Sequence, residues 1–347
     1  MDPTSASLRI LQIHPSRRCN LRCLHCYSSS SPDEREELDC ALLGQALIDA
    51  GAEGYGVASF SGGEPLLYRS LPEVLDRSHE AGLITTVTSN GMLLDERRLD
   101  MLRGRLDLLA ISLDGVPASH DRMRGSARAF AAMTSHLRGV RKSGIPFGFI
   151  FTLRQSNLHE LDWVARFALE AEARLLQIHP LETAGRAIEQ LPGQRPDEIE
   201  AAFAYLEAAR IQNMVGDRLV IQLDLLNRDL LRQDPGFVVA EGEGNDDVAQ
   251  RLANLVSPLV IEADGTVVPL EYGFAREYAL GNLHATRLSQ LATSWRRQGY
   301  RAFRTLCRRV FAEETVPHEF PFVNWYETVT SAATVATATT PATCMPG

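Results

Sequence analysis

Three cysteines stand close together near the start of the chain. In the stretch "RRCNLRCLHCYS", Cys19, Cys23 and Cys26 are separated by three and then by two residues. Thiolates at this spacing in a loop can converge on one metal centre. A structural zinc ion takes four protein ligands, and a [4Fe-4S] cluster has four irons to satisfy. With three thiolates nearby, such a cluster would keep one iron open to a ligand from outside the protein.

A second candidate segment is "SFSGGEPLLY", which carries Gly62, Gly63, Glu64 and Pro65 directly after a β-forming run at 57–60. Two adjacent glycines allow the backbone to approach another group closely. Glu64 or the nearby carbonyls can accept a hydrogen bond from an ammonium group. The segment therefore indicates a close approach of the backbone to another group, with hydrogen-bond acceptors beside it.

Polar residues also follow the next expected strands. They are Ser89 and Asn90 in "TSNG", Ser112 and Asp114 in "SLDG", and Thr152 and Arg154 in "FTLRQSN". They are candidate binding residues at the ends of the strands. The competing interpretation is that polar residues at strand ends are only solvated caps.

Short β-forming runs alternate with amphipathic helical segments through the first half of the chain. We expect strands at 8–14, 56–60, 84–88, 106–113, 147–153 and 175–178, and helices at 40–50, 71–81, 95–103, 127–142 and 158–170. Strands that are each followed by a helix pair in parallel through right-handed crossovers, and such a sheet curls toward a barrel. The candidate residues all follow strands, and in barrels of this kind the chemistry lies at the carboxyl ends of the strands.

The predicted fold class is α/β, a partial (β/α)6 TIM-like barrel with a smaller α+β C-terminal extension. We expect the barrel core at residues 8–190 and the extension, with its helical linker, at 191–328. The linker has a long amphipathic run after Pro196, and Asp264-Gly265 between two β-branched runs predicts a hairpin. The small polar residues of 329–347 predict a disordered tail.

Composition narrows the possible functions. The 347 residues carry a formal net charge of -9, and 45% of them are hydrophobic. An acidic chain disfavours nucleic-acid binding, which generally needs clustered basic charge. No apolar run is long enough for a membrane span and no secretion signal is evident, so we expect a cytoplasmic protein. Six cysteines in such a protein do not indicate a disulfide framework.

The cysteine spacing and the "GGEP" segment together resemble the radical S-adenosylmethionine (SAM) superfamily. The resemblance implies one [4Fe-4S] cluster on Cys19, Cys23 and Cys26, with SAM on the open iron. It implies an enzyme that reductively cleaves SAM to a 5'-deoxyadenosyl radical, which abstracts hydrogen from a substrate C-H bond. An external one-electron donor such as flavodoxin or ferredoxin would supply the electron.

The same resemblance suggests roles for individual residues. Residues 62–65 would meet the amino group of SAM, and Thr152 and Arg154 would meet its carboxylate and ribose. His25, just before the third cysteine, stands where a side chain flanks the adenine. Separately from the resemblance, the register of the sixth expected strand places His179 toward the cavity.

The C-terminal third resembles a degenerate SPASM/twitch-like extension. Relatives carry a cysteine after the proline of the hairpin, where this chain has Leu270, and Cys307 is the only cysteine that remains in the region. We therefore expect that the auxiliary clusters are lost. Cys307 is a candidate hydrogen-atom donor, and the competing interpretation is a small buried side chain.

The substrate divides into two classes. A small natural-product-type molecule, such as a sugar, nucleoside or amino-acid derivative, is favoured because no leader-recognition domain is fused ahead of the first strand. The alternative is a maturase that modifies a ribosomally made peptide.

Two interpretations without catalysis stay open. A structural zinc module could use the three cysteines with His14 or His25, and an electron-transfer protein could add Cys40 as a fourth ligand. Neither explains the "GGEP" segment, and Cys40 opens a predicted amphipathic helix.

Overall fold

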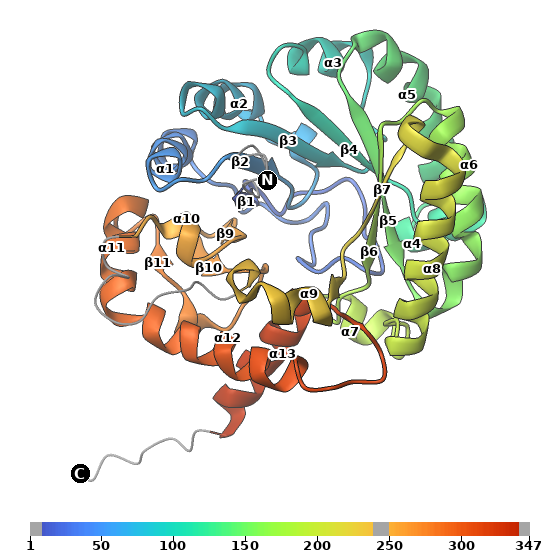
Figure 1. Ribbon diagram of the computed structural model, residues 1–347. Helices are drawn as coiled ribbons and strands as arrows, with labels where there is room; N and C mark the ends of the chain where they lie inside the picture. Colours follow the sequence, from blue (N-terminus) through green and yellow to red (C-terminus); the bar gives the residue numbers. More distant parts are fainter. Residues whose placement is uncertain (1–8, 239–249, 340–347) are drawn as a thin grey trace.

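The computed structural model describes residues 9–238 and 250–339. Its main sheet has ten strands in the order β11-β10-β9-β1-β2-β3-β4-β5-β6-β7. The strands β1 to β7 are neighbours in chain order, all parallel, as expected for a barrel wound by right-handed crossovers. Figure 1 shows the sheet curving around a centre, with helices along its outer side.

All six strands that the sequence predicts are present. They are β1 (Ile10–Ile13), β2 (Val57–Phe60), β3 (Ile84–Ser89), β4 (Leu108–Ser112), β5 (Phe147–Leu153) and β6 (Leu175–Pro180). The five predicted helices are also present, as α1 (Cys40–Ala52), α2 (Leu71–Glu80), α3 (Glu96–Leu102), α5 (Ala129–Ser143) and α6 (Leu161–Glu170). The predicted partial TIM-like barrel is confirmed.

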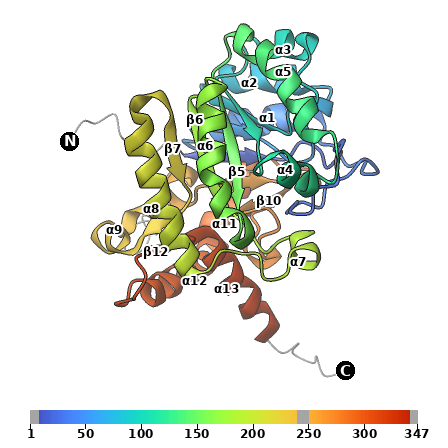
Figure 2. The same cartoon turned by 90° about the vertical axis from the view of Figure 1, so that its right-hand side faces the viewer.

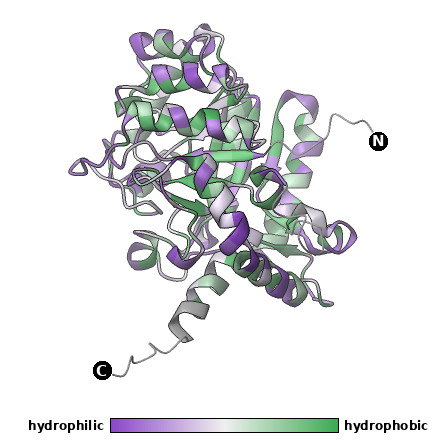
Figure 3. Ribbon diagram, turned by 90° about the vertical axis from the view of Figure 1, so that its left-hand side faces the viewer, coloured by the Kyte–Doolittle hydropathy of each residue, from purple (hydrophilic) through white to green (hydrophobic). Residues whose placement is uncertain are grey.

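Burial alternates along the strands and distinguishes the two faces of the sheet. On β5, Phe149 and Phe151 are fully buried, and Phe149 contacts Phe167 of α6. Ile150 and Thr152, which alternate with them along the strand, are half-buried on the inner face. Figure 3 shows the same division by colour, with hydrophobic strands inside and hydrophilic outer surfaces on the helices. The apolar core therefore lies between sheet and helices, while the inner face stays partly open.

One helix beside the barrel was not predicted. α4 (Pro117–Arg124) begins with a proline in its first turn and ends at Gly125, which has φ 61°. Its sequence "PASHDRMR" has no apolar stripe, because four of its eight residues are charged or histidine. The helix depends on capping residues and on its contacts rather than on periodicity.

The C-terminal extension continues the sheet on its other side. β9 (Leu259–Ile261) pairs in parallel with β1, and β10 (Thr266–Pro269) pairs antiparallel with β9. The turn between them contains Gly265 at φ 82°, so the predicted hairpin is confirmed. β11 (Gly281–Asn282) completes this edge.

Helices and a small second sheet complete the described structure. α8 (Glu198–Val215), which follows the proline as predicted, leads to β7 (Val220–Leu223). β8 (Leu226–Asn227) pairs with β12 (Phe322–Val323). The remaining helices are α7 (Ala187–Gln190), α9 (Arg228–Gln233), α10 (Leu252–Leu255), α11 (Leu288–Gln298), α12 (Tyr300–Glu314) and α13 (Trp325–Thr339). Figure 2 shows α12 and α13 below the barrel strands.

The prediction that the chain is disordered from residue 329 is wrong for 329–339, which belong to α13. Val329 and Ala333 are fully buried one turn apart, so small residues still supply an apolar contact face. The hydroxyl of Thr330 lies 2.9 Å from the carbonyl oxygen of Tyr326, one turn earlier in the helix. Residues 340–347, including Cys344, lie outside the described residues.

In the described part of the chain, no helix has both the length and the apolarity that a membrane crossing needs.

Candidate functional site

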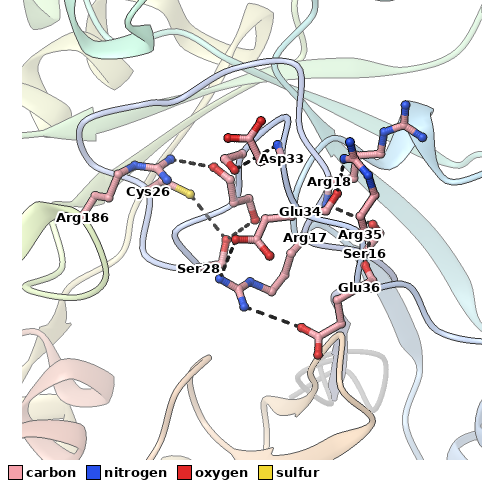
Figure 4. A network of polar contacts seen from close by, with 12 residues as sticks. Ser16, Arg17, Arg18, Cys26, Ser28, Asp33, Glu34, Arg35, Glu36 and Arg186 are labelled. Carbon is pink, nitrogen blue, oxygen red and sulfur yellow. Dashed lines mark hydrogen bonds and ion pairs between the residues drawn. The ribbon is translucent and has the colours of Figure 1, made fainter.

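The three cysteines lie on the loop that leaves β1, at the carboxyl edge of the parallel strands. Hydrogen bonds within the loop close it on itself, because Cys19 N donates to Ser31 O at 3.0 Å. Arg186, which follows β6, crosses to the loop and donates from Nε to Cys23 O and from Nη2 to Ser30 O, both at 2.8 Å. Figure 4 shows Arg186 beside Cys26. The loop after β1 is therefore held by its own backbone bonds and by Arg186 from the segment after β6.

The start of the loop is fixed by ion pairs. Arg17 pairs with Glu34 at 3.3 Å and with Glu36 at 3.7 Å, which joins the two ends of the loop (Figure 4). These side chains are about one third exposed, so each pair alone contributes little. Backbone bonds between Arg17 and Glu36 and between Arg17 and Ser31 add to the same closure.

The thiols of Cys19 and Cys23 are buried, and that of Cys26 is half-buried. Burial, with the nearby Glu64, Cys23 and Cys26, raises the pKa of Cys19 to about 12. The three sulfurs are therefore close enough to repel one another as thiolates. Bound cationic metal centres reverse this preference, because they hold cysteine in its deprotonated form.

Every one of the three sulfurs has a polar neighbour. Leu21 N donates to Cys19 Sγ at 3.4 Å, and the Ser28 hydroxyl lies 3.5 Å from Cys26 Sγ. Arg124 Nη1 donates to Cys23 Sγ at 3.7 Å. Donors of this kind stabilise thiolates and the sulfurs of iron-sulfur clusters.

Within the described residues, no three His, Cys, Asp or Glu side chains converge on a single metal ion. The zinc interpretation required such a group with His14 or His25. His14 instead packs between Tyr27 and Tyr272, and burial lowers its pKa to about 3. A [4Fe-4S] cluster is larger than a single metal ion, so its three thiolate ligands need not converge on one common point.

The "GGEP" segment packs directly against the cysteine loop. Gly63 N donates to Ser16 O at 2.8 Å and Glu64 N donates to Arg18 O at 2.9 Å. Gly62 has φ 105°, and a Cβ on Gly63 would lie 2.1 Å from Arg18 O. The two glycines thus serve a close approach between two stretches of this chain.

Glu64 itself is 2% exposed and joins three loops. Its carboxylate accepts from Ser89 Oγ and Asn90 N, both at 2.9 Å, and from Leu66 N at 3.2 Å. Asn90 Nδ2 in turn donates to Asn20 Oδ1 on the cysteine loop at 2.8 Å. The residues predicted after β2 and β3 are therefore brought together, beside Cys19. Pro65 opens a short 3-10 turn that follows Glu64.

The residues predicted after β4 form a buried network. Asp114 is fully buried, and its Oδ2 lies 2.6 Å from Arg124 Nε. His25 Nε2 lies 3.7 Å from the other oxygen, and burial lowers the pKa of His25 to about 4. Ser112, 8% exposed, stands at the end of the same strand. Arg124 was not predicted, because α4 has no periodic signal.

The residues predicted after β5 include an arginine with unused donors. Arg154 is 2% exposed, and its Nη1 donates to Ser156 Oγ at 2.8 Å. Its Nε and Nη2 have no hydrogen-bond partner among the described residues. Thr152 stands beside His179 of β6 in the sheet register. A buried guanidinium with two unused nitrogens suits an anionic group such as a carboxylate.

A second polar cluster surrounds His179. Its Nδ1 lies 2.8 Å from Asp224 and its Nε2 lies 3.0 Å from Glu182. Burial alone would lower the pKa of His179, but the bonds to these two carboxylates outweigh it and raise the pKa well above its usual value. Asp224 comes directly after β7, and this strand was not predicted from the sequence.

Further carboxylates join this cluster from the C-terminal extension. Glu271 follows β10 and accepts from Thr330 Oγ1 of α13 at 2.8 Å. Burial and the nearby Glu182 raise the pKa of Glu271 to about 8. Glu327 of α13 pairs with Arg195 at 3.0 Å. The extension therefore supplies part of the wall at the barrel mouth.

A cavity of about 450 Å³ adjoins the cluster. Leu153 and Pro180, at the carboxyl ends of β5 and β6, form one side of it. α8 and α13 form the other side, and Arg195 and Glu327 lie in its lining. Such a volume accommodates a small organic molecule or a few residues of a peptide.

The other described cysteines lie apart from this site. Cys307 is 2% exposed in the core on α12, and burial raises its pKa to about 12. Cys40 is the first residue of α1, after the N-cap Asp39, as the sequence predicts. The proposed role of Cys307 as a hydrogen-atom donor stays a prediction.

Residues 13–168 match the family model of the radical SAM superfamily. Over 173 residues the chain is 34% identical to Fe-coproporphyrin III synthase of Methanosarcina barkeri, covering 49% of this chain and 43% of that protein. Over 225 residues it is 28% identical to PqqA peptide cyclase of Xanthomonas axonopodis, covering 63% and 59%. The chain thus spans less than two thirds of these two relatives.

The fold resembles that of Streptococcus suis SuiB in its structure with S-adenosylmethionine. The TM-score is 0.64 at 15% sequence identity, and the match covers 86% of this chain and 68% of SuiB. At this identity the likeness concerns the fold alone.

Proposed function

Residues 13–168 match the radical SAM superfamily, and from this match we propose that Cys19, Cys23 and Cys26 bind a [4Fe-4S] cluster. Enzymes of this superfamily use such a cluster together with SAM. When bound, the two groups would supply a 5'-deoxyadenosyl radical that abstracts hydrogen from a substrate C-H bond. The observation that carries the proposal is that three thiols on one loop each have a polar neighbour at the carboxyl edge of the barrel.

The residues around the loop fit SAM as a second ligand. We propose that the unused Nε and Nη2 of Arg154 bind its carboxylate, which would satisfy two buried donors at once. Residues 62–65 contribute backbone groups for its amino group, since Glu64 already accepts three hydrogen bonds. His25 stays neutral because of burial and can flank the adenine without adding charge.

The C-terminal extension contributes to substrate binding in this proposal. The cluster around His179 and the neighbouring cavity lie at the barrel mouth, where parallel barrels keep their active sites.

We propose a small natural-product-type molecule as the substrate. A similarity to a protein named Fe-coproporphyrin III synthase supports this class. A ribosomally made peptide is the second candidate, and the similarity to PqqA peptide cyclase favours it. Incubation of the active enzyme with candidates of both classes, followed by mass spectrometry, separates the two.

The test of the proposed function is anaerobic reconstitution with iron and sulfide, followed by addition of dithionite and SAM. We expect the wild type to form 5'-deoxyadenosine and the Cys19→Ala/Cys23→Ala/Cys26→Ala variant to form none. Cys40→Ala serves as the matched control, because it removes a thiol outside the site and should leave iron content and product unchanged. Binding of zinc without iron would overturn the proposal.

A further inference from the structure

Arg124 brings a positive charge to one of the three cysteines. Its Nη1 donates to Cys23 Sγ at 3.7 Å, and each of the two residues is 7% exposed. Leu24 N donates to Met123 O at 2.9 Å, so the end of α4 is attached to the cysteine loop by the backbone as well. Figure 2 shows α4 next to that loop. The contact between guanidinium and sulfur is therefore built into the packing of the helix.

Asp114 holds the arginine from the opposite side. Its Oδ2 lies 2.6 Å from Arg124 Nε, and the carboxylate is fully buried. Two histidines also face Asp114, with His25 Nε2 at 3.7 Å from Oδ1 and His120 Nδ1 at 4.0 Å from Oδ2. The guanidinium of Arg124 keeps its positive charge at neutral pH, and burial lowers the pKa of His120 to about 4.

We propose that Arg124 is a positioning residue for the iron-sulfur cluster: it donates to the Cys23 sulfur and raises the midpoint potential of the cluster, and Asp114 orients it. The inference rests on the proposed function, because it takes Cys23 as a cluster ligand. Hydrogen bonds to the sulfurs, together with burial and net charge, set the reduction potentials of such clusters. Reduction adds one negative charge, which a buried guanidinium stabilises strongly at low dielectric.

Substitution of Arg124 and substitution of Asp114 should shift the midpoint potential of the cluster in opposite directions. Arg124→Met removes the donor and the positive charge and leaves the Asp114 carboxylate, so the midpoint potential should fall. Asp114→Asn keeps the shape and leaves the Arg124 charge uncompensated, so the potential should rise. A purely structural role would not give shifts of opposite sign.

The experiment measures the midpoint potential of the reconstituted holoenzyme without SAM, by titration with dithionite under electron paramagnetic resonance detection. We expect Arg124→Met to lower the potential by at least 59 mV, the equivalent of a tenfold weaker stabilisation of the reduced cluster for one electron. Asp114→Asn should shift it upward. Arg296→Met is the matched control, because it removes another arginine whose side chain is largely buried, one that pairs with Glu53 away from the site. Its potential should equal that of the wild type.

Each single variant leaves one buried charge unpaired and can fail to fold. The double variant Asp114→Asn/Arg124→Met removes both charges and keeps the volume. Its potential should still lie below the wild type, because the donor to Cys23 is gone. This variant decides the question even where the single variants are insoluble.

The outcomes separate the two proposals. A wild type that binds no iron and gives no cluster signal would overturn the proposed function. A wild-type cluster whose potential stays the same in the variants, or shifts in the same direction in both single variants, would overturn the role of Arg124 alone.

Discussion

The backbone of Gly63 passes so close to Arg18 that a Cβ at position 63 would lie 2.1 Å from the Arg18 carbonyl oxygen. Gly63 N also donates to Ser16 O at 2.8 Å. The end of β2 and the loop that carries the cysteines thus share one interface. The glycine is required by this contact within the chain, since any side chain would push the loop away.

Gly63→Ala should displace the cysteine loop and reduce iron binding after reconstitution to near background. Overpacking of this kind costs about 1–3 kcal/mol of stability. The control is Gly44→Ala in α1, where the nearest atom to a new Cβ is a flexible side-chain carbon at 3.7 Å. Alanine should stabilise that helix by up to about 1 kcal/mol. Iron analysis and thermal unfolding of the two variants check both statements, and normal iron content in Gly63→Ala would contradict the first.

The barrel strands could be predicted from sequence because hydrophobic periodicity and the order of elements determine them. The six parallel strands, and with them the edge that carries Cys19, Glu64 and Arg154, follow from alternation alone. Two glycines before Glu64 also signalled a close approach, although the group approached is the cysteine loop. These parts of the site depend on local signals.

The remaining parts depend on contacts between distant segments. Arg124 lies on a short helix without an apolar stripe, and Asp224 follows a strand that pairs only at the edge of the barrel sheet. Glu271 reaches His179 and Glu182 because the hairpin of the extension joins the sheet next to β1. No local pattern marks these residues, so tertiary structure was needed to find them. The same holds for α13, whose small residues become a contact face only when packed.

Glu271→Gln should become more stable than the wild type as the pH rises. Burial raises the pKa of Glu271 from 4.5 to about 8, so the folded chain binds this proton more tightly than the unfolded chain. The wild type therefore loses stability between about pH 4.5 and pH 8, and the neutral variant does not. Urea unfolding at pH 5 and pH 9 at fixed ionic strength checks this. A stability difference that is equal at the two pH values would contradict it.

His179 should remain an imidazolium at neutral pH. The carboxylates of Asp224 and Glu182 raise its pKa well above 6.5, despite burial. Its contribution to stability is fully present below pH 6.5 and is lost as the pH rises through the pKa of the folded state. Histidine nitrogen chemical shifts followed by NMR should show titration only in the alkaline range. Asp224→Asn should move that titration toward lower pH, and an unchanged curve would show that the contact at 2.8 Å does not stabilise the charge.

Arg154→Met should weaken SAM binding by the reconstituted protein about 10- to 150-fold, the equivalent of the roughly 1.5–3 kcal/mol of a hydrogen bond to a charged group. The reason is that Arg154 is 2% exposed and has two nitrogens without a partner among the described residues, so a carboxylate would gain two charge-assisted bonds there. Arg141→Met is the matched control, because Arg141 is exposed and pairs only at the surface with Glu172. Isothermal titration calorimetry with SAM compares the two variants. Equal affinities would show that Arg154 binds something other than the SAM carboxylate, whereas selective loss in Arg154→Met would place that carboxylate at the carboxyl end of β5.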